Sequence, residues 1–340
     1  MIAQRVAGIE STRCIRRFDL QRDLRPLAEL IQVAFREELE RSDTQMVAEL
    51  LKMANAWPLL YLLSAFGPAL SSLMSGYVWI ADGRLVGNVT LAAESKRRGL
   101  WAISNVAVHP EYRGHGIARQ LMQTALEEAR DKDAHRVVLQ VQTDNVPAQR
   151  LYGELGFRLY DTVVELRLPT HARTRRTVGA SVALRKRRAA DKQNLYDLFK
   201  AATPIGRQLV RPVLLHHYRW GTEDRLGQSL DNLLNGRRRF DRVLEVRGRI
   251  VALLQVTGHY TRTAHRLRIT VHPNHRGTVE GDLVDAGCRI LSRFPLRDVA
   301  STVSTAHPEA LQALQKTGFR TGRELDQMLL DLDTAKRGTS

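Results

Sequence analysis

A short glycine-bearing turn contains the residue types best suited to chemistry. Residues 113–116, Arg-Gly-His-Gly, lie between an apolar run at 100–108 and an amphipathic run that begins at Ile117. Backbone N–H groups at the start of a helix have no intrahelical partner, and the helix dipole places positive charge behind them. Glycine lets this backbone approach a ligand closely. The turn therefore suits a phosphate group, although an ordinary strand–helix turn shows the same local pattern.

The flanking segments must position this turn. Residues 100–108 predict a buried strand that ends at His109-Pro110, because proline has no N–H to give to a sheet. A helix is expected from 117 to about 132, followed by a strand at 136–142. A second helix at 148–155 should end at Gly156, which suits a C-terminal cap. One or two final strands are expected within 157–168.

The segments before the turn predict more elements of the same fold. Helices are expected at 23–40 and 44–54, and a hairpin at 77–92 around Asp82-Gly83, a strong turn signal. The uncharged stretch 59–81 is long enough to cross a bilayer. Because Gly67-Pro68 and later Ser and Gly residues interrupt it, we expect a short helix, a loop and a strand instead, and no membrane association.

Composition narrows the class of protein. The chain has 340 residues, enough for two domains, with 43% hydrophobic and 26% charged residues, as in soluble globular proteins. Its net charge of +16 permits an anionic partner, but no basic stretch alternates with aromatic residues, which disfavours nucleic acid. Cys14 and Cys288 lie far apart and outside any metal-ligand spacing. We therefore expect no disulfide framework, no metal and a cytoplasmic location.

The second half of the sequence repeats the first. Val108-His-Pro-x-x-Arg-Gly114 matches Val271-His-Pro-x-x-Arg-Gly277, and Gly156-Phe157 matches Gly318-Phe319 at nearly the same spacing. The hairpin at 79–87 likewise matches 244–252. Anchors in one order at a nearly constant offset indicate a duplicated fold. We expect domains at 12–168 and 182–334, joined by a basic linker at 169–181.

Two motifs identify a family resemblance. One is Arg-x-x-Gly-x-Gly/Ala, here from Arg113 to Ala118; the other is Asn-x-x-Ala-x-x-Leu-Tyr-x-x-x-Gly-Phe, here from Asn145 to Phe157. With both, residues 12–168 resemble the GNAT superfamily of acetyl-coenzyme A-dependent N-acetyltransferases. The second half resembles the same fold with weaker motifs. The resemblance implies an α/β protein (α+β, mixed sheet) made of two tandem acyl-CoA N-acyltransferase (GNAT) folds.

The resemblance also implies a site for acetyl-CoA. The backbone at 106–108 would pair with pantetheine, the turn would hold the pyrophosphate, Arg119 would lie near its charge, and Asn145 would fix the cofactor from the other side. The implied cofactor-binding residues are Val106, Ala107, Val108, Arg113, Gly114, His115, Gly116, Ile117, Ala118, Arg119 and Asn145.

The implied reaction is direct attack of a primary amine on the thioester, within a ternary complex. Tyr152 stands at the family's proton-donor position, where a neutral hydroxyl can protonate the leaving thiolate; a core tyrosine is the alternative. The acceptor is a small molecule or a peptide. The base stays open among Glu94, Asn105 with a water, and an acid before Tyr77. Gln140 stands where N-terminal acetyltransferases of the ribosomal-protein type often have a glutamate, and it cannot act as a base.

The second copy departs from the motifs where the cofactor should bind. Val279 replaces Gly116, Glu280 replaces Ile117, and His307 and Leu314 stand at the Asn145 and Tyr152 positions. We therefore expect a degenerate copy that keeps the fold and has lost acetyl-CoA binding. The run Arg237-Arg238-Arg239 is interpreted as a solvated loop rather than an anion site. A non-catalytic regulatory protein that senses acetyl-CoA or binds nucleic acid is the alternative function, and a homodimer is left open.

Overall fold

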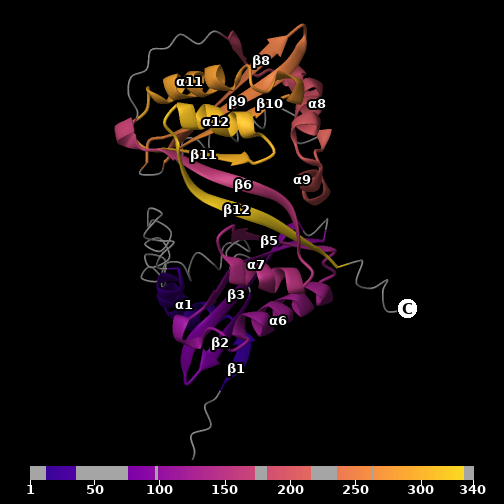
Figure 1. Cartoon of the computed structure of the whole chain (residues 1–340), viewed down its shortest axis with the longest axis vertical. Helices are drawn as coiled ribbons and strands as arrows, with labels where there is room; N and C mark the ends of the chain where they lie inside the picture. The colour runs from indigo at the N-terminus through magenta and orange to yellow at the C-terminus, as the bar shows by residue number, and fades with distance from the viewer. Residues whose placement is uncertain are drawn as a thin grey trace, which may run out of the picture. The chain divides into compact units, whose positions relative to one another are not determined.

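The computed structural model describes residues 13–35, 76–95, 99–172, 182–215, 236–261 and 264–332, which form two compact units (Figure 1). Unit 1 takes its described residues from Met1–Gln140, Pro147–Arg158 and Met328–Ser340. Unit 2 takes its own from Val141–Val146 and Leu159–Gln327. Among these residues, no helix has both the length and the apolar character needed to cross a membrane. The helix expected at 44–54 lies outside the described residues.

Unit 1 is built on a mixed sheet. Its strands follow one another in space in chain order and then meet the last strand of the chain. They are β1 Cys14–Arg17, β2 Gly76–Ala81, β3 Arg84–Ser95, β4 Leu100–Val108, β5 Arg136–Gln142 and β12 Arg320–Asp331, of which only residues 328–331 belong to unit 1. The pairs β1–β2, β2–β3 and β3–β4 are antiparallel, and β4–β5 is parallel. The expected hairpin is confirmed, because Asp82 and Gly83 join β2 to β3 with φ of 51° and 74°.

Helices cover both faces of this sheet. α1 Leu20–Ala34 begins three residues earlier than expected, because the side chain of Asp19 accepts hydrogen bonds from Gln21 N and Arg22 N. α6 Ile117–Asp131 packs on β2, β3 and β4, and a Cβ on Gly87 would lie 3.0 Å from its Leu121 side chain. The alternation of β3 directs the side chains after Gly87 alternately to this face and to the α1 face. α7 Val146–Glu154 follows β5.

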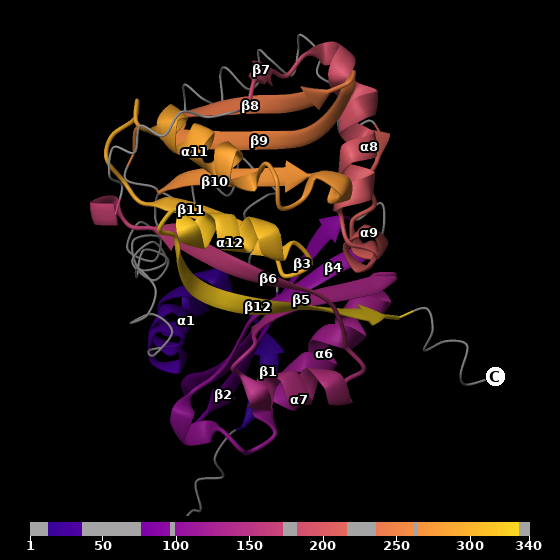
Figure 2. The same ribbon diagram turned by 45° about the horizontal axis from the view of Figure 1, so that its top comes forward.

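Unit 2 repeats this architecture. Its strand order is β12-β6-β11-β10-β9-β8-β7, and Figure 2 shows β8 to β11 side by side. The remaining strands are β6 Arg158–Leu168, β7 Leu184–Lys186, β8 Arg237–Val246, β9 Arg249–His259, β10 His265–Val271 and β11 Val299–Ser304. The helices are α8 Lys192–Ala202, α9 Ile205–Val210, α11 Glu280–Leu291 and α12 Pro308–Lys316. The mixed α/β class that we expected is confirmed.

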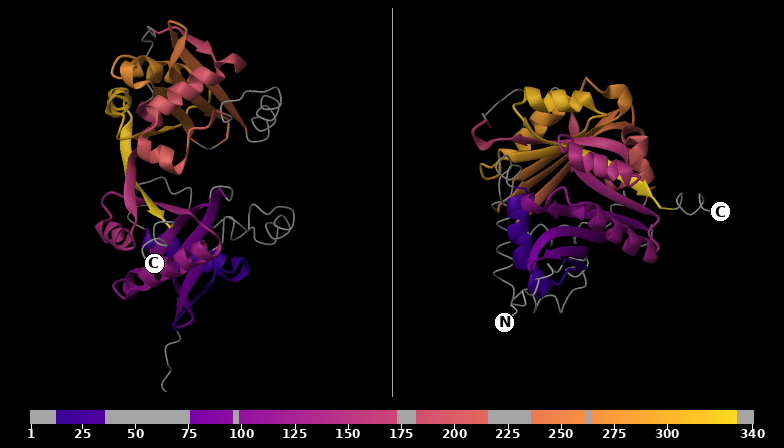
Figure 3. Two further views of the ribbon diagram at one scale, coloured as in Figure 1. Left: turned by 90° about the vertical axis from the view of Figure 1, so that its right-hand side faces the viewer. Right: turned by 60° about the horizontal axis from the view of Figure 1, so that its bottom comes forward.

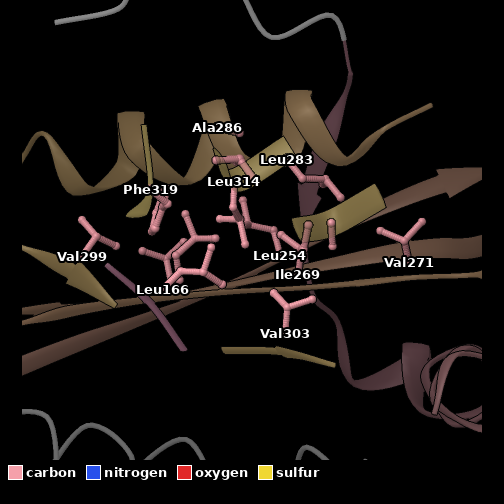
Figure 4. Packing of buried hydrophobic residues seen from close by; sticks show 14 of the residues in the cluster. Leu166, Leu254, Ile269, Val271, Leu283, Ala286, Val299, Val303, Leu314 and Phe319 are labelled. Carbon is pink, nitrogen blue, oxygen red and sulfur yellow. The ribbon is translucent and has the colours of Figure 1, made fainter. Parts of the chain in front are cut away.

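The larger core of unit 2 lies between its sheet and the helices α11 and α12. Figure 4 shows Leu254 and Ile269 of the sheet packed beneath Leu283 and Leu314 of these helices. A Cβ on Gly287 of α11 would lie 2.4 Å from the Leu267 side chain, so glycine allows the helix to approach the sheet closely. On the opposite face, α8 packs through Leu195 and Leu198 onto Val243 and Leu253. Helices therefore pack on both faces of the unit 2 sheet.

The expected final strands of the first repeat form a single strand, β6, which belongs to unit 2 from Leu159 onwards. It pairs antiparallel with β11 from Val299↔Leu168 to Ser304↔Val163 and runs beside β12 (Figure 3). Residues 328–331 of β12 belong to unit 1, where Leu332 N donates a hydrogen bond of 2.9 Å to His135 O. Unit 2 thus contains nearly all of β6, the last strand of the first repeat, and most of β12, whereas only the end of β12 belongs to unit 1.

One expectation about unit 2 is wrong. The run Arg237-Arg238-Arg239 is not a solvated loop, because it opens β8 and pairs with β9 from Arg237↔His259 to Arg239↔Thr257. The hairpin turn at Arg247-Gly248 explains this: its residues have φ of 50° and 73°, and it sets a register that extends along both strands.

Candidate functional site

The strands β4 and β5 separate after a short paired stretch. Their pairs are Leu100↔Arg136, Trp101↔Val137 and Ala102↔Val138. Beyond Ala102, the described residues of β4 pair with β3 alone. Val106, Ala107 and Val108 lie on this separated part. Its backbone groups on the β5 side are therefore available to an extended ligand that adds itself like a strand.

A β-bulge lies on the same part of β4. Asn88 pairs with Ala107 and Thr90 with Ser104, so two residues of β4 face one of β3, and Asn105 has a φ of 51°. Asn88 Nδ2 donates a 2.8 Å hydrogen bond to Asn105 O, and Asn105 Nδ2 donates one of 3.3 Å to Thr90 Oγ1. Sequence reasoning missed Asn88 and Thr90. The available signal was two polar residues inside the otherwise apolar run 85–93 of β3.

The glycine turn then leads into α6. Gly114 and Gly116 have φ of 80° and 74°, and Gly116 is the residue at the helix N-cap. A Cβ at Gly114 would meet no atom within 4 Å, and at Gly116 only Gln120 Nε2 at 3.9 Å. Left-handed backbone, not crowding, therefore calls for glycine here. No side chain caps α6, so the N–H groups of its first turn have no capping acceptor, which fits an anion.

Arg113 holds the turn in place. Its Nε donates to Val108 O at 3.3 Å, and its Nη2 donates to Ala34 O, the last residue of α1, at 3.0 Å. Arg276 of unit 2 donates in the same manner to Ala202 O, the last residue of α8, at 3.3 Å. Because the second repeat keeps this contact although its turn is closed, we interpret the contact as structural. Arg113 therefore anchors the turn to the first helix, and its charge stays close to the turn.

The other turn residues have distinct surroundings. His115 Nδ1 lies 3.0 Å from Arg113 O, and the Ile117 side chain is buried against Gly87. Arg119 of α6 forms an ion pair with Glu154 of α7, and both side chains are well exposed. Glu154 therefore already offsets part of the Arg119 charge that was expected to face the cofactor. The contact also joins α6 to the helix that carries Tyr152.

Tyr152 is a buried side chain of α7. It is 6% exposed and packs edge-on against Phe157, with ring centroids 6.1 Å apart. Burial raises the pKa of its hydroxyl to about 12, so the group stays neutral and can donate a proton. Asn145 lies in the segment 141–146, which belongs to unit 2. The structure thus brings the turn and Tyr152 into unit 1 but does not assign Asn145 to them.

Unit 2 keeps part of this geometry and lacks the rest. β10 and β11 also separate early, after His265↔Val299 and Arg266↔Ala300, and Gly277 has the same φ of 80° as Gly114. However, β9 and β10 pair without a register shift, so the bulge is missing. Val279, in the place of Gly116, has a φ of −122°. The replacement of one glycine thus changes the path of the backbone into α11.

A carboxylate occupies the equivalent turn of unit 2. Glu280 is 2% exposed, and its Oε2 accepts a 3.2 Å hydrogen bond from Val279 N. Its Oε1 lies 2.9 Å from His307 Nε2. Burial alone would raise the pKa of Glu280, but the hydrogen bonds from His307 and from backbone N–H groups lower it. The side chain therefore places a stable negative charge on the N–H groups that an anion would need.

Comparison with known proteins shows which family has this arrangement of motifs. A family model described as the acetyltransferase (GNAT) family matches residues 27–157. The N-alpha-acetyltransferase RimI of Mycobacterium tuberculosis is 32% identical over 126 residues, which cover 35% of this chain and 75% of that protein. The chain belongs to the GNAT acetyltransferase family. The matched region includes β4, the glycine turn and the Tyr152 motif of this GNAT protein.

Other relatives show how much of each protein the similarity covers. N-alpha-acetyltransferase 30 of Schizosaccharomyces pombe is 34% identical over 88 residues, 25% of this GNAT chain and 57% of that protein. A putative [ribosomal protein bS18]-alanine N-acetyltransferase of Bacillus subtilis is 39% identical over 66 residues, and this match spans 44% of that relative's own length. A solved structure described as a tandem GNAT protein from the clavulanic acid biosynthesis pathway matches 94% of this chain and 98% of its own, with a TM-score of 0.53 at 17% identity. This likeness concerns the fold and confirms two GNAT folds in tandem.

Proposed function

We propose that the protein is an acetyl-CoA-dependent N-acetyltransferase in which the first repeat transfers the acetyl group to a primary amine. The observation that carries the proposal is the continuous path in unit 1 from the separated, bulged β4 to the uncapped start of α6. Relatives named N-alpha-acetyltransferases, at 32% and 34% identity, support this reaction class. The acceptor is an amine on a small molecule or a peptide.

The residues of unit 1 fit this cofactor. The backbone of Val106–Val108 can pair with an extended pantetheine arm, and the N–H groups from Gly114 to Ala118 can hold a pyrophosphate. Arg113 and Arg119 add positive charge. Acetyl-CoA, when bound, supplies the acetyl group as a thioester.

The protein's own groups would have two tasks in this reaction, to stabilise developing negative charge and to transfer a proton. Backbone N–H groups near Val108 would stabilise the negative charge that develops on the carbonyl oxygen. Tyr152 would give its proton to the leaving sulfur as the amine attacks. Formation of the amide releases one proton from the amine nitrogen, which balances the proton that the phenolate takes up again. Tyr152 regains its proton in this way at every pH below about 12, because burial raises its pKa to that value.

The second repeat is proposed to be inactive. Glu280 fills its turn with negative charge, Val279 removes the left-handed N-cap, and Leu314 replaces the tyrosine. We expect this copy to stabilise the active one or to shape its acceptor site.

The test is coenzyme A release from acetyl-CoA across polyamines, amino acids, aminoglycosides and N-terminal peptides. The proposal predicts turnover with at least one amine and, in Gly116→Ala, a higher KM for acetyl-CoA. No turnover across the panel, together with a steeply salt-dependent gel shift, would instead support a regulatory protein that binds nucleic acid.

A further inference from the structure

Arginines gather on the face of the unit 2 sheet that α8 covers in part, and the proposed chemistry does not use them. Arg239 of β8 and Arg266 of β10 both pair with Thr257 of β9, so the three residues form one row across the sheet. Arg268 lies two residues after Arg266 and therefore on the same face. The intervening residue, Leu267, is buried in the core on the other face.

Carboxylates on this face are fewer than the arginines. Asp241 is shared between Arg239, at 3.0 Å, and Arg187, at 3.4 Å. Asp161 lies 3.3 Å from Arg207 of α9. For Arg266 and Arg268, the part of the chain that the structure describes offers no acidic partner. Positive charge is therefore left in excess.

The exposed arginines Arg207, Arg239 and Arg266 lie close enough to the exposed Arg268 for their charges to act on it. Partial desolvation, and then the charges of Arg207, Arg239 and Arg266, lower the pKa of Arg268. The sheet register holds three of them at fixed positions, so they cannot move apart freely. Like charges held this way cost free energy, which a bound anion would offset.

We propose that this face of unit 2 binds a small anion with two or more phosphate groups through Arg207, Arg239, Arg266 and Arg268. The planar guanidinium group matches phosphate oxygens in pairs. Residues two apart on a strand are separated by about 7 Å, and residues on alternate strands by about 10 Å. A row of this size exceeds one phosphate group and matches a diphosphate better.

Calorimetry on the full chain tests this site with inorganic pyrophosphate as the probe and with coenzyme A present in excess to occupy unit 1. We expect pyrophosphate to bind, and Arg266→Gln and Arg268→Gln each to weaken binding at least about tenfold. Inorganic phosphate should bind more weakly than pyrophosphate. Both substitutions are at exposed positions, and unchanged thermal midpoints would show that the fold is kept.

Arg238→Gln is the matched control, because Arg238 lies next to Arg239 on β8 but pairs with Gly258, which faces the α11 side. The affinity of the Arg238→Gln variant for pyrophosphate should equal that of the wild type. Equal weakening in Arg238→Gln, absence of pyrophosphate binding, or binding of oligonucleotides that pyrophosphate does not displace would overturn the proposal. If coenzyme A fails to bind unit 1, the proposed function fails, while the dependence of pyrophosphate binding on Arg268 still decides this site.

Discussion

Glu280 and His307 meet at the start of α11, with 2.9 Å between Glu280 Oε1 and His307 Nε2. They stand at the positions of Ile117 and Asn145 in the first repeat. Glu280 Oε2 also accepts from Val279 N, so the carboxylate satisfies the turn from within the chain. The same turn is thus open in one copy and closed by its own side chain in the other, which turns a binding element into a stabilising one.

The first prediction concerns this contact. Glu280→Gln should lower the free energy of unfolding at pH 7 by about 1–3 kcal/mol, because it replaces one of the two buried carboxylate oxygens, which contact His307 and Val279 N, with an amide donor. The pKa of Glu280 is lowered in the folded protein, so its contribution is present above about pH 4.5 and is lost as the pH falls through the folded value. Urea unfolding from pH 7 down to about pH 3 should therefore show a smaller loss of stability with acid in the variant, with the difference appearing below the unfolded pKa.

A double-mutant cycle with His307→Ala is the control. Because the two side chains share one hydrogen bond, their effects should be non-additive. Additive losses, or an unchanged pH dependence in Glu280→Gln, would contradict the stabilising role.

The second prediction compares two glycines with the same conformation. Gly116 and Gly277 have φ of 74° and 80°, and a Cβ would meet nothing closer than 3.8 Å at either. Alanine at each position should cost about 1 kcal/mol of stability, because left-handed backbone disfavours a side chain. Only Gly116→Ala should weaken acetyl-CoA binding, by about tenfold or more, equivalent to about 1.4 kcal/mol. Val279, with a φ of −122°, shows how a side chain redirects this turn.

Isothermal calorimetry with acetyl-CoA and urea unfolding of both variants measure these effects. Unchanged affinity in Gly116→Ala, or an equal loss in Gly277→Ala, would mean that the turn of unit 1 does not hold the cofactor.

Local chemistry made much of the fold predictable. Asp82-Gly83 specified its hairpin, and β4 and β5 have the expected bounds because both are apolar runs bounded by turn residues. The membership of β6 in unit 2 was not predictable, because the alternation of β6 is the same whichever strand it pairs with. The arginines of β8 were misjudged for a related reason: register from a distant turn, at Arg247-Gly248, places them in a strand despite their polarity.

The glycines of the candidate site could be predicted from the sequence, but the residues that hold the β-bulge and the turn in place could not. Gly114 and Gly116 carry a recognisable motif, and the structure gives both positive φ values. Asn88 and Thr90 support the bulge across the strand pair, and no local spacing connects them with Asn105. Contacts between segments distant in sequence, such as Arg113 with Ala34, are likewise set by packing.

The third prediction separates anchoring from charge at Arg113. If its guanidinium bridges Val108 O and Ala34 O, lysine cannot replace it, because an ammonium group lacks the spread donors. Arg113→Lys and Arg113→Ala should therefore lose similar stability, about 1 kcal/mol after allowance for partial exposure. Arg276→Lys should lose about as much without a change in the affinity for acetyl-CoA. Full rescue by Arg113→Lys in thermal unfolding would show that charge alone matters.

The last prediction concerns proton donation. Tyr152→Phe keeps the buried ring and its contact with Phe157 but removes the hydroxyl. We expect kcat to fall by about a hundredfold or more, within the usual range for loss of a general acid, with little change in KM for acetyl-CoA. Because burial raises the pKa of Tyr152 to about 12, the wild-type rate should rise with pH as the amine loses its proton and should show no decline from this tyrosine below that pH. Steady-state kinetics from pH 6 to 10 measure both effects, with Tyr260→Phe, at an exposed site of unit 2, as the control. A kcat that Tyr152→Phe leaves unchanged across this range would return Tyr152 to a purely structural role.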